Sequence, residues 1–349
     1  MITATYTQGS TLKFTDAPRP SITEDEILLH VDAASICGTD LKIARHGHRK
    51  LKAGQSIVLG HEFVGTIEQT GARVRNFSEG QRVGVAPNIG CGHCEMCERG
   101  LMNMCPNFSA FGINIDGAHT EFVRIPAAAI AQGNLIPLES DISPAEAALA
   151  EPLSCAVNGV RVSQVRPGDT VLIYGAGPMG LFNLMVAVIS GAAQAFVVDL
   201  DDARLETAKA LGASKTFNSS RGAVKDWVME ETHGRGVDAV ITAVPVPQLQ
   251  ADALQLLAPF GRLCLFAGLT AGASVVPLDT NLIHYKNLIV TGMSGGSPQD
   301  YQAALRLIEA RRVDVTRLTS HVFPISEVDK AYEVALSGKG MKVVLVASG

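Results

Sequence analysis

The strongest constraint on the fold is a glycine-rich turn inside a long uncharged stretch. From Thr170 to Val198 the chain has no Asp, Glu, Lys or Arg. A transmembrane helix needs ~20 apolar residues, but several glycines and Pro178 interrupt this stretch. The pattern therefore predicts a strand, a turn, a buried helix and a second strand, which form a buried βαβ unit and no membrane span.

The second half of the chain continues to alternate apolar and helical segments. The expected strands are Thr170–Tyr174, Ala195–Asp199, Asp238–Val244, Arg262–Ala267 and Leu288–Thr291, with a last strand at Lys342–Val346. The expected helices are Met179–Ser190, Asp202–Leu211, which ends before Gly212, and Pro298–Arg311. This alternation predicts an α/β domain with a doubly wound parallel sheet, with Leu288–Thr291 near one edge.

The first half of the chain is β-rich. Apolar residues alternate over Ile27–Asp32 as in a half-buried strand, and further short strands are expected at Phe63–Ile67 and Arg82–Ala86. At Ser143 the sequence Ser-Pro-Ala-Glu has the pattern of a helix N-terminus. We expect that helix to end near Glu151, because the proline that follows disfavours helical geometry in the residue before it. A length of 349 residues fits about two domains.

The turn Gly175-Ala176-Gly177-Pro178-Met179-Gly180 matches the G-x-G-x-x-G pattern of dinucleotide-binding folds. Its first glycine permits a tight turn, its second lets the backbone approach a pyrophosphate, and its third allows close packing of helix on strand. An ordinary glycine turn is the alternative, but the flanking strand, helix and acidic residue favour a cofactor site. The expected cofactor-binding residues are Gly175, Gly177, Pro178, Met179, Gly180, Asp199, Arg204, Val244, Ala267 and Leu269.

The acidic residues after this unit favour NAD over NADP. Asp199 ends the second strand and is placed to accept hydrogen bonds from the adenosine ribose. Asp201 and Asp202 follow, and three carboxylates would repel a 2′-phosphate. Arg204 weakens this preference slightly, because an arginine pairs readily with phosphate.

Four of the seven cysteines lie within fifteen positions, in the pattern Cys91-x2-Cys94-x2-Cys97-x7-Cys105. An odd number of cysteines with such a cluster is a poor disulfide framework, and four thiolates suit a closed tetrahedral zinc site. An iron–sulfur cluster is the runner-up, although ferredoxins have three residues before the last cysteine and not seven. A closed site has no position for substrate, so we expect this zinc to be structural.

The remaining composition excludes several classes of protein. Hydrophobic residues make up 47% and charged residues 18%, which argues against disorder. The net charge of −5 and the absence of a basic composition around the cysteines argue against a nucleic-acid partner. The N-terminal MITATYTQGS has no basic region followed by an apolar one, so we expect no secretory signal and a cytoplasmic location.

A second candidate metal set is dispersed along the chain. It consists of Cys37, His61 with Glu62, and Glu151. Taken separately, each is unremarkable, because a lone cysteine is usually a small core residue. Spacing alone does not join them.

The segment Gly60-His61-Glu62-x2-Gly65-x5-Gly71-x2-Val74 resembles the signature of zinc-containing alcohol dehydrogenases of the medium-chain dehydrogenase/reductase superfamily. Cys37-Gly38-Thr39-Asp40, the cysteine lobe and the glycine turn follow in that family's order, so the resemblance covers essentially the whole chain. It implies a GroES-like β-rich catalytic domain, a Rossmann domain and an active site in the cleft between them. The implied boundaries are 1–152 for the catalytic domain with a zinc lobe at about 88–108, 153–291 for the NAD-binding domain, and 292–349 for the return to the catalytic domain.

The resemblance also implies two zinc ions per chain and a role for each ligand. Asp40 matches the carboxylate that orients the histidine ligand, and Thr39 matches the hydroxyl residue that contacts the alcohol. A zinc with an open position lowers the pKa of a bound hydroxyl toward ~7, and NAD then accepts the hydride. The implied ligands of the catalytic zinc are Cys37 and His61 with Glu62, Glu151 or both, since the two glutamates need not bind at once. Those of the structural zinc are Cys91, Cys94, Cys97 and Cys105. The implied catalytic residues are Thr39, Glu62 and Lys42.

Several positions depart from the family's patterns. Lys42 stands where many relatives have a histidine of the proton relay, so Lys42, His46 or a water chain is expected to serve. Glu151 followed by Pro-Leu resembles the polyol dehydrogenase branch, whereas threonine dehydrogenases usually have Asp-Pro there. Those enzymes also have a histidine near the position of Asn88, and both departures count against L-threonine as the substrate. The stretch 292–296 lacks the Arg-Tyr pair of sorbitol dehydrogenases.

These features favour a zinc- and NAD-dependent dehydrogenase of a polyol or sugar alcohol. The alternatives are a dehydrogenase of a sugar phosphate or sugar acid, an L-threonine 3-dehydrogenase-like enzyme, and an NAD-binding regulatory protein without activity. A basic run at 45–52 is either a solvated loop or a clamp for an anionic substrate. We expect a homodimer or homotetramer, because relatives pair the exposed edges of this sheet.

Overall fold

The computed structural model describes residues 1–139, 141–270 and 272–347, and the chain divides into two compact units. One unit comprises Met1–Ser154 together with Gly296–Gly349, and the other comprises Cys155–Gly295. In the described part of the chain, no helix has the length and apolar character needed to cross a membrane.

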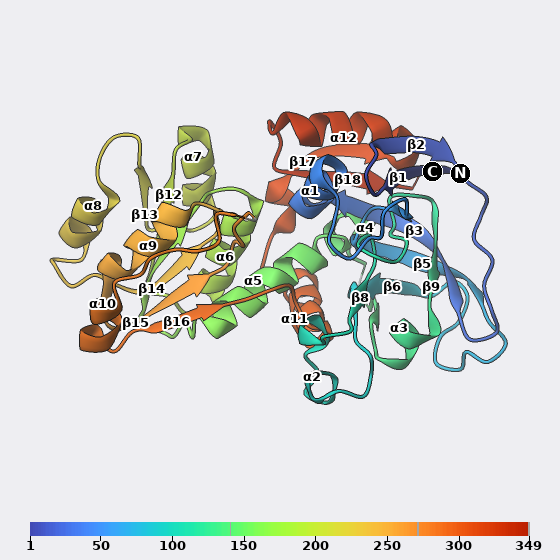
Figure 1. Cartoon of the computed structure of the whole chain (residues 1–349), viewed down its shortest axis with the longest axis horizontal. Coiled ribbons are helices and arrows are strands. Elements are labelled where there is room, and N and C mark those ends of the chain that lie inside the picture. Colours follow the sequence, from blue (N-terminus) through green and yellow to red (C-terminus); the bar gives the residue numbers. More distant parts are fainter. Residues whose placement is uncertain (140, 271, 348–349) are drawn as a thin grey trace. The chain divides into compact units, whose positions relative to one another are not determined.

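The second unit is built on a six-stranded parallel sheet (Figure 1). Its strands are β11 (Thr170–Tyr174), β12 (Gln194–Asp199), β13 (Lys215–Asn218), β14 (Val237–Thr242), β15 (Leu257–Leu265) and β16 (Ile289–Gly292). They are arranged in the order β13-β12-β11-β14-β15-β16. The order reverses between β11 and β14, as in dinucleotide-binding folds. The predicted doubly wound parallel sheet is confirmed, with β16 at its edge.

Helices connect these strands as the sequence predicts, with small shifts at their ends. They are α5 (Ala150–Val162), α6 (Pro178–Ile189), α7 (Asp202–Ala210), α8 (Val224–Glu231), α9 (Pro247–Leu256) and α10 (Thr280–Lys286). All residues of α6 from Gly180 to Ala187 are buried, which explains the uncharged stretch. Gly212 has a φ of +104° just after α7, a conformation that glycine adopts without strain.

One predicted helix is wrong in its extent. Ser143 does cap a helix, since its Oγ accepts from the Glu146 N–H at 3.3 Å, but that helix is only α4 (Pro144–Ala147). A new helix, α5, starts at Ala150 and runs through Pro152. Proline is tolerated there because the N–H groups of a helix's first turn have no intrahelical acceptor. Glu151 therefore lies at the start of a helix and not at the end of one.

The first unit contains a seven-stranded sheet in the order β10-β6-β5-β3-β18-β17, with β9 paired to β3. Its strands are β3 (Ile27–Ile36), β5 (Glu62–Thr70), β6 (Arg82–Val85), β9 (Phe122–Ile125), β10 (Leu135–Pro137), β17 (Thr319–Pro324) and β18 (Lys342–Val346). A smaller sheet joins β2 (Leu12–Asp16), β1 (Ile2–Thr7) and β4 (Ser56–Val58). The remaining helices of this unit include α11 (Pro298–Glu309) and α12 (Val328–Ser337).

β3 differs from the expected half-buried strand. Ile27, Leu28 and Leu29 are all buried, and only His30 and Asp32 are half-buried. Consecutive side chains of a strand point to opposite faces, so both faces of β3 are covered where it lies between its neighbours β5, β9 and β18. A strand covered on both faces loses the alternation that the sequence suggested.

Three of these strands bring distant residues to one edge of the sheet. β3 is antiparallel to both β5 and β18, with Ser35 opposite Glu62 and Ile36 opposite Val343. The end of β3 therefore lies beside the beginnings of β5 and β18 (Figure 1). This edge carries the candidate site.

Candidate metal centres and cofactor site

Cys37, His61 and Glu62 meet at this sheet edge. Cys37 follows β3 and is the N-cap of α1 (Gly38–His46), while His61 and Glu62 stand at the start of β5. Their ligand atoms all lie within 4.8 Å of one another. Glu62 is fully buried, His61 is 8% exposed and Cys37 is half-buried. The structure thus joins residues that spacing alone could not join.

The chemistry of this set fits a divalent cation. The Oε1 atom of Glu62 is buried and has no hydrogen-bond partner among the described residues. Burial and the charge of Glu62 raise the pKa of the Cys37 thiol. A bound cation offsets both costs, because it coordinates the free oxygen and favours the thiolate. One thiolate, one imidazole and one carboxylate are ligands that zinc accepts.

Asp40 holds the two ligand-bearing turns together. Its carboxylate accepts the backbone N–H groups of Cys37 at 2.9 Å and Gly60 at 3.2 Å. The same carboxylate lies 3.3 Å from His61 Nδ1, which leaves Nε2 for a metal. Although burial alone would raise it, the neighbouring His61 and His119 lower the pKa of Asp40 to about 2. Asp40 is therefore a charged group beside His61, in the place of the orienting carboxylate that the resemblance implied.

Gly60 is required for this arrangement. It has a φ of +100°, and a Cβ on it would lie 2.5 Å from Cδ2 of His119. His119 is buried, and its Nδ1 lies 2.8 Å from the Tyr332 hydroxyl. The turn that carries His61 is thus packed against an internal side chain.

Two residues of the site were not predicted from the sequence. Ser35 on β3 donates a hydrogen bond to Glu62 Oε2, and Lys342 at the start of β18 forms an ion pair with the same oxygen. Lys342 also donates to the carbonyl of Ile36 at 3.3 Å. The sequence marks Lys342 only as a charged residue at the start of an apolar strand, and it gives no signal for Ser35.

The other predicted catalytic residues lie outside this cluster of three. Glu151 is buried, with 6% exposure, and acts electrostatically on Lys342 and Tyr301. Thr39 and Lys42 are exposed on α1. Of the two candidate glutamate ligands, the structure groups Glu62 with Cys37 and His61.

The four cysteines of the predicted lobe converge as expected. The separations are 3.5 Å for the Sγ atoms of Cys94 and Cys97, 3.7 Å for Cys94 and Cys105, and 4.0 Å for Cys91 and Cys97. A tetrahedral zinc with bonds of about 2.3 Å requires sulfur separations of about 3.8 Å. An iron–sulfur cluster would need some wider separations, since its four thiolates are divided between two or four irons. The geometry therefore fits a single zinc ion.

Neighbouring groups support this lobe. A hydrogen bond from the backbone of His93 lowers the pKa of the Cys91 thiol to about 6. A Cβ on Gly90 would lie 2.4 Å from Cys97 Sγ, so the loop packs closely on the sulfur. Asn88 donates to the carbonyl of Gly296 at 3.2 Å and accepts from Asn134 at 2.8 Å, which gives it a structural role.

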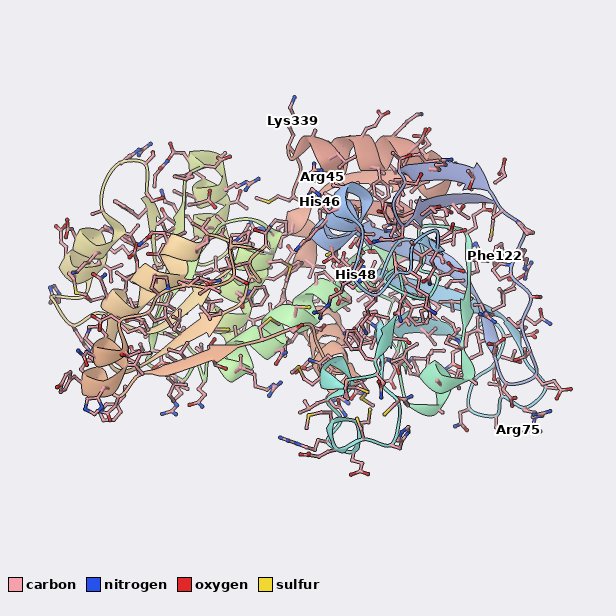
Figure 2. All side chains as sticks on the ribbon, viewed as in Figure 1. Arg45, His46, His48, Arg75, Phe122 and Lys339 are labelled. Atoms are coloured by element: carbon pink, nitrogen blue, oxygen red, sulfur yellow. The ribbon has the colours of Figure 1, made fainter. Side chains whose placement is uncertain are left out.

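The basic run divides into two groups. Lys50 Nζ donates to the carbonyl of Phe108 at 2.5 Å and lies 3.1 Å from the centre of its ring, beside the cysteine lobe. Arg45 and His46 are at the exposed end of α1, and His48 follows it (Figure 2). At least one member of the run is thus structural.

The glycine turn has the geometry of a dinucleotide site. Gly175 has a φ of +100°, and a Cβ on Gly180 would lie 1.8 Å from the Gly175 carbonyl oxygen. A Cβ on Gly177, at the N-terminus of α6, would have open space around it. This is the arrangement that close approach of a pyrophosphate needs. Val244 lies against Gly175, within 2.6 Å of where its Cβ would be.

The acidic residues near the turn have separate partners. Asp199 accepts the N–H of Ala176 at 2.6 Å, which links it to the glycine turn. Asp201 caps α7 and lies 3.9 Å from Arg204, while Asp202 pairs with Arg221 at 2.5 Å. Two of the three carboxylates thus have arginine neighbours, whereas Asp199 is bound to the glycine turn itself.

Two protein families match this chain, one in its first half and one in its second. Residues 23–137 match the alcohol dehydrogenase GroES-like domain, and residues 178–310 match the zinc-binding dehydrogenase family. Over 343 residues the chain is 33% identical to an L-threonine 3-dehydrogenase of Bacillus velezensis, which covers 97% of this chain and 95% of that protein.

Solved structures of dehydrogenases are similar to almost the whole chain. A chain from Sinorhizobium meliloti with bound NADP has a TM-score of 0.89 at 26% identity and covers 99% of this chain and 98% of that one. Galactitol-1-phosphate dehydrogenase from Escherichia coli has a TM-score of 0.88 at 25% identity and covers 99% and 100%. These similarities confirm the GroES-like and Rossmann parts, the two zinc sites and an NAD(P) cofactor.

Replacing Cys97 tests the structural zinc. We expect Cys97→Ala to bind one zinc per chain in place of two and to have a lower Tm, because metal binding and folding are coupled in such sites. A ligand present at 100 times its Kd stabilises a fold by about 2.7 kcal/mol. Cys264→Ala, at a buried cysteine of the other unit, is the control that should keep both ions. Unchanged zinc content and Tm in Cys97→Ala would show that the lobe holds no metal.

Proposed function

We propose that this chain, which belongs to the zinc-containing medium-chain alcohol dehydrogenase family, oxidises the secondary alcohol of a small hydroxy acid, with L-threonine the first substrate to test. That it is a zinc- and NAD(P)-dependent dehydrogenase acting on CH–OH follows from the family. The observation that supports the finer proposal is the similarity to L-threonine 3-dehydrogenases over almost the whole chain. It favours an enzyme like L-threonine 3-dehydrogenase over a dehydrogenase of polyols.

The residues of the sheet edge have the roles that this chemistry needs. Cys37, His61 and Glu62 hold the catalytic zinc, and Asp40 fixes the orientation of the His61 ring. When bound, zinc acts as a Lewis acid on the substrate oxygen, and the nicotinamide accepts the hydride. Glu151 contributes negative charge near the site through its effect on Lys342.

The proton leaves along one face of α1. Thr39, Lys42 and His46 stand three and four residues apart, so they lie on the same side of that helix. Thr39 contacts the reacting hydroxyl and passes its proton through water to the imidazole of the exposed His46, while the Lys42 ammonium lies beside this path and donates to its water. This route takes the place of the relay histidine that the chain lacks.

A polyol or its phosphate is the second candidate substrate. It is supported by the similarity to galactitol-1-phosphate dehydrogenase and by the Glu151-Pro152-Leu153 sequence. Arg45 and Arg49, both exposed, supply positive charge for a phosphate.

A substrate panel tests the proposed function. With NAD as cofactor, we expect kcat/KM for L-threonine to exceed that for galactitol, sorbitol and galactitol 1-phosphate by at least about tenfold, a difference of ~1.4 kcal/mol in transition-state binding. His61→Ala, which removes a zinc ligand, should abolish all of these activities and lower the zinc content to one ion. Higher efficiency with galactitol 1-phosphate would favour the second candidate. Full activity in His61→Ala would reject the zinc mechanism.

We propose that NAD is preferred over NADP because of Asp199. Asp199→Ala should reduce kcat/KM for NAD by about 10- to 100-fold, the range expected for lost hydrogen bonds to a charged group. Asp199→Asn keeps an acceptor for the Ala176 N–H but removes the charge, so its efficiency with NADP should rise about tenfold relative to NAD. Equal use of both cofactors by the wild type would contradict this role of Asp199.

We also propose that the chain forms a homodimer or homotetramer through β16. This strand ends the sheet order, and Ile289 on it is 43% exposed. An exposed apolar edge strand favours pairing with a second copy. Light scattering at micromolar concentration should give a multiple of the chain's mass, and Ile289→Lys should shift the population toward monomer. A monomeric wild type would refute the proposal.

A further inference from the structure

A buried ion pair stands directly behind the catalytic zinc ligands. Lys342 is 4% exposed and Glu62 is fully buried, and they meet where β18, β3 and β5 lie side by side (Figure 1). Nothing in a hydride-transfer mechanism requires a lysine at this point. A charged pair in such a place is costly to bury unless each charge has its partners.

The partners of Glu62 are divided unequally between its two oxygens. Oε2 accepts from both Ser35 and Lys342, whereas Oε1 is buried and has no hydrogen-bond partner among the described residues. One oxygen is thus anchored to the sheet. The other is the one left for a metal ion held with Cys37 and His61.

Lys342 acts on more than one anionic group of the site. Its ammonium also interacts electrostatically with Cys37 and Glu151. A second cation beside Glu62 competes with zinc for the same carboxylate, because the charge that the lysine neutralises is not available to the metal. A glutamate weakened in this way would hold a zinc ion through Oε1 alone.

We propose that Lys342 is a positioning residue that controls the coordination of the catalytic zinc, because it holds Glu62 Oε2 in an ion pair and so restricts this glutamate to a single, weak metal bond. The coordination position that remains is then open to the substrate alcohol. Without the lysine, both oxygens of Glu62 are available to zinc and the open position closes. This inference rests on the proposed function only in requiring a zinc ion at Cys37, His61 and Glu62.

The main test replaces the ammonium with an uncharged chain of similar length. In Lys342→Met we expect zinc to leave the catalytic site about tenfold more slowly when a chelator is added. With cobalt at that site, the visible absorption spectrum should shift, because a second carboxylate oxygen would replace water as a ligand. The KM for the alcohol should rise more than kcat falls. Lys342→Arg, which keeps the charge, is the matched control and should resemble the wild type in all three measurements.

A double-mutant cycle shows whether Lys342 acts through Glu62. If it does, Lys342→Met should have little further effect on zinc release in a Glu62→Gln background. Ser35→Ala removes the other anchor of Oε2 and should change zinc release in the same direction as Lys342→Met but less. It therefore tests the inference even if Lys342→Met does not fold.

The outcomes separate this inference from the proposed function. Two zinc ions per chain with wild-type release rates and cobalt spectra in both Lys342→Met and Ser35→Ala would overturn the role of Lys342 alone. Faster zinc release in Lys342→Met would also overturn it, since Lys342 would then merely support the fold. A wild type with only the lobe zinc would overturn both proposals.

Discussion

One buried carboxylate holds the chemistry of this protein in place. Asp40 accepts backbone N–H groups from the turn of Cys37 and the turn of Gly60, and it faces the ring of His61. The two main zinc ligands are therefore fixed by a single group, although 24 residues separate them in the sequence. A buried anion keeps its charge only where donors surround it, so neither turn can move without leaving Asp40 unsatisfied.

Much of the fold and of two sites could be predicted because the responsible patterns are local. The glycine turn, its strand and its buried helix occupy one continuous segment, and each feature has a steric reason that holds in any context. The same is true of the cysteine lobe, where short loops bring four sulfurs to the spacing of one zinc ion. The sheet order then confirmed both the parallel topology and the edge position of β16.

The catalytic set could not be assembled from spacing, because antiparallel pairing between distant strands creates it. Glu62 faces Ser35 across β3 and β5, and Lys342 arrives from a strand 280 residues away. Resemblance to a family supplied the ligands, yet it gave no reason to expect Ser35 or Lys342. The error at Glu151 has a related cause: the proline rule is valid inside a helix, but Pro152 occupies a first turn, where the rule does not apply.

The choice of substrate must come from residues outside the metal set. Cys37, His61 and Glu62 provide the same Lewis-acid chemistry to a hydroxy acid and to a polyol, so they cannot discriminate between the two. Asn88 is engaged with Gly296, and Lys50 with Phe108 beside the lobe, which gives both a structural role. Under the proposed function, a substrate anion would therefore be recognised by the exposed basic residues at the end of α1 and after it, where we expect a charge change to alter specificity without disturbing the zinc.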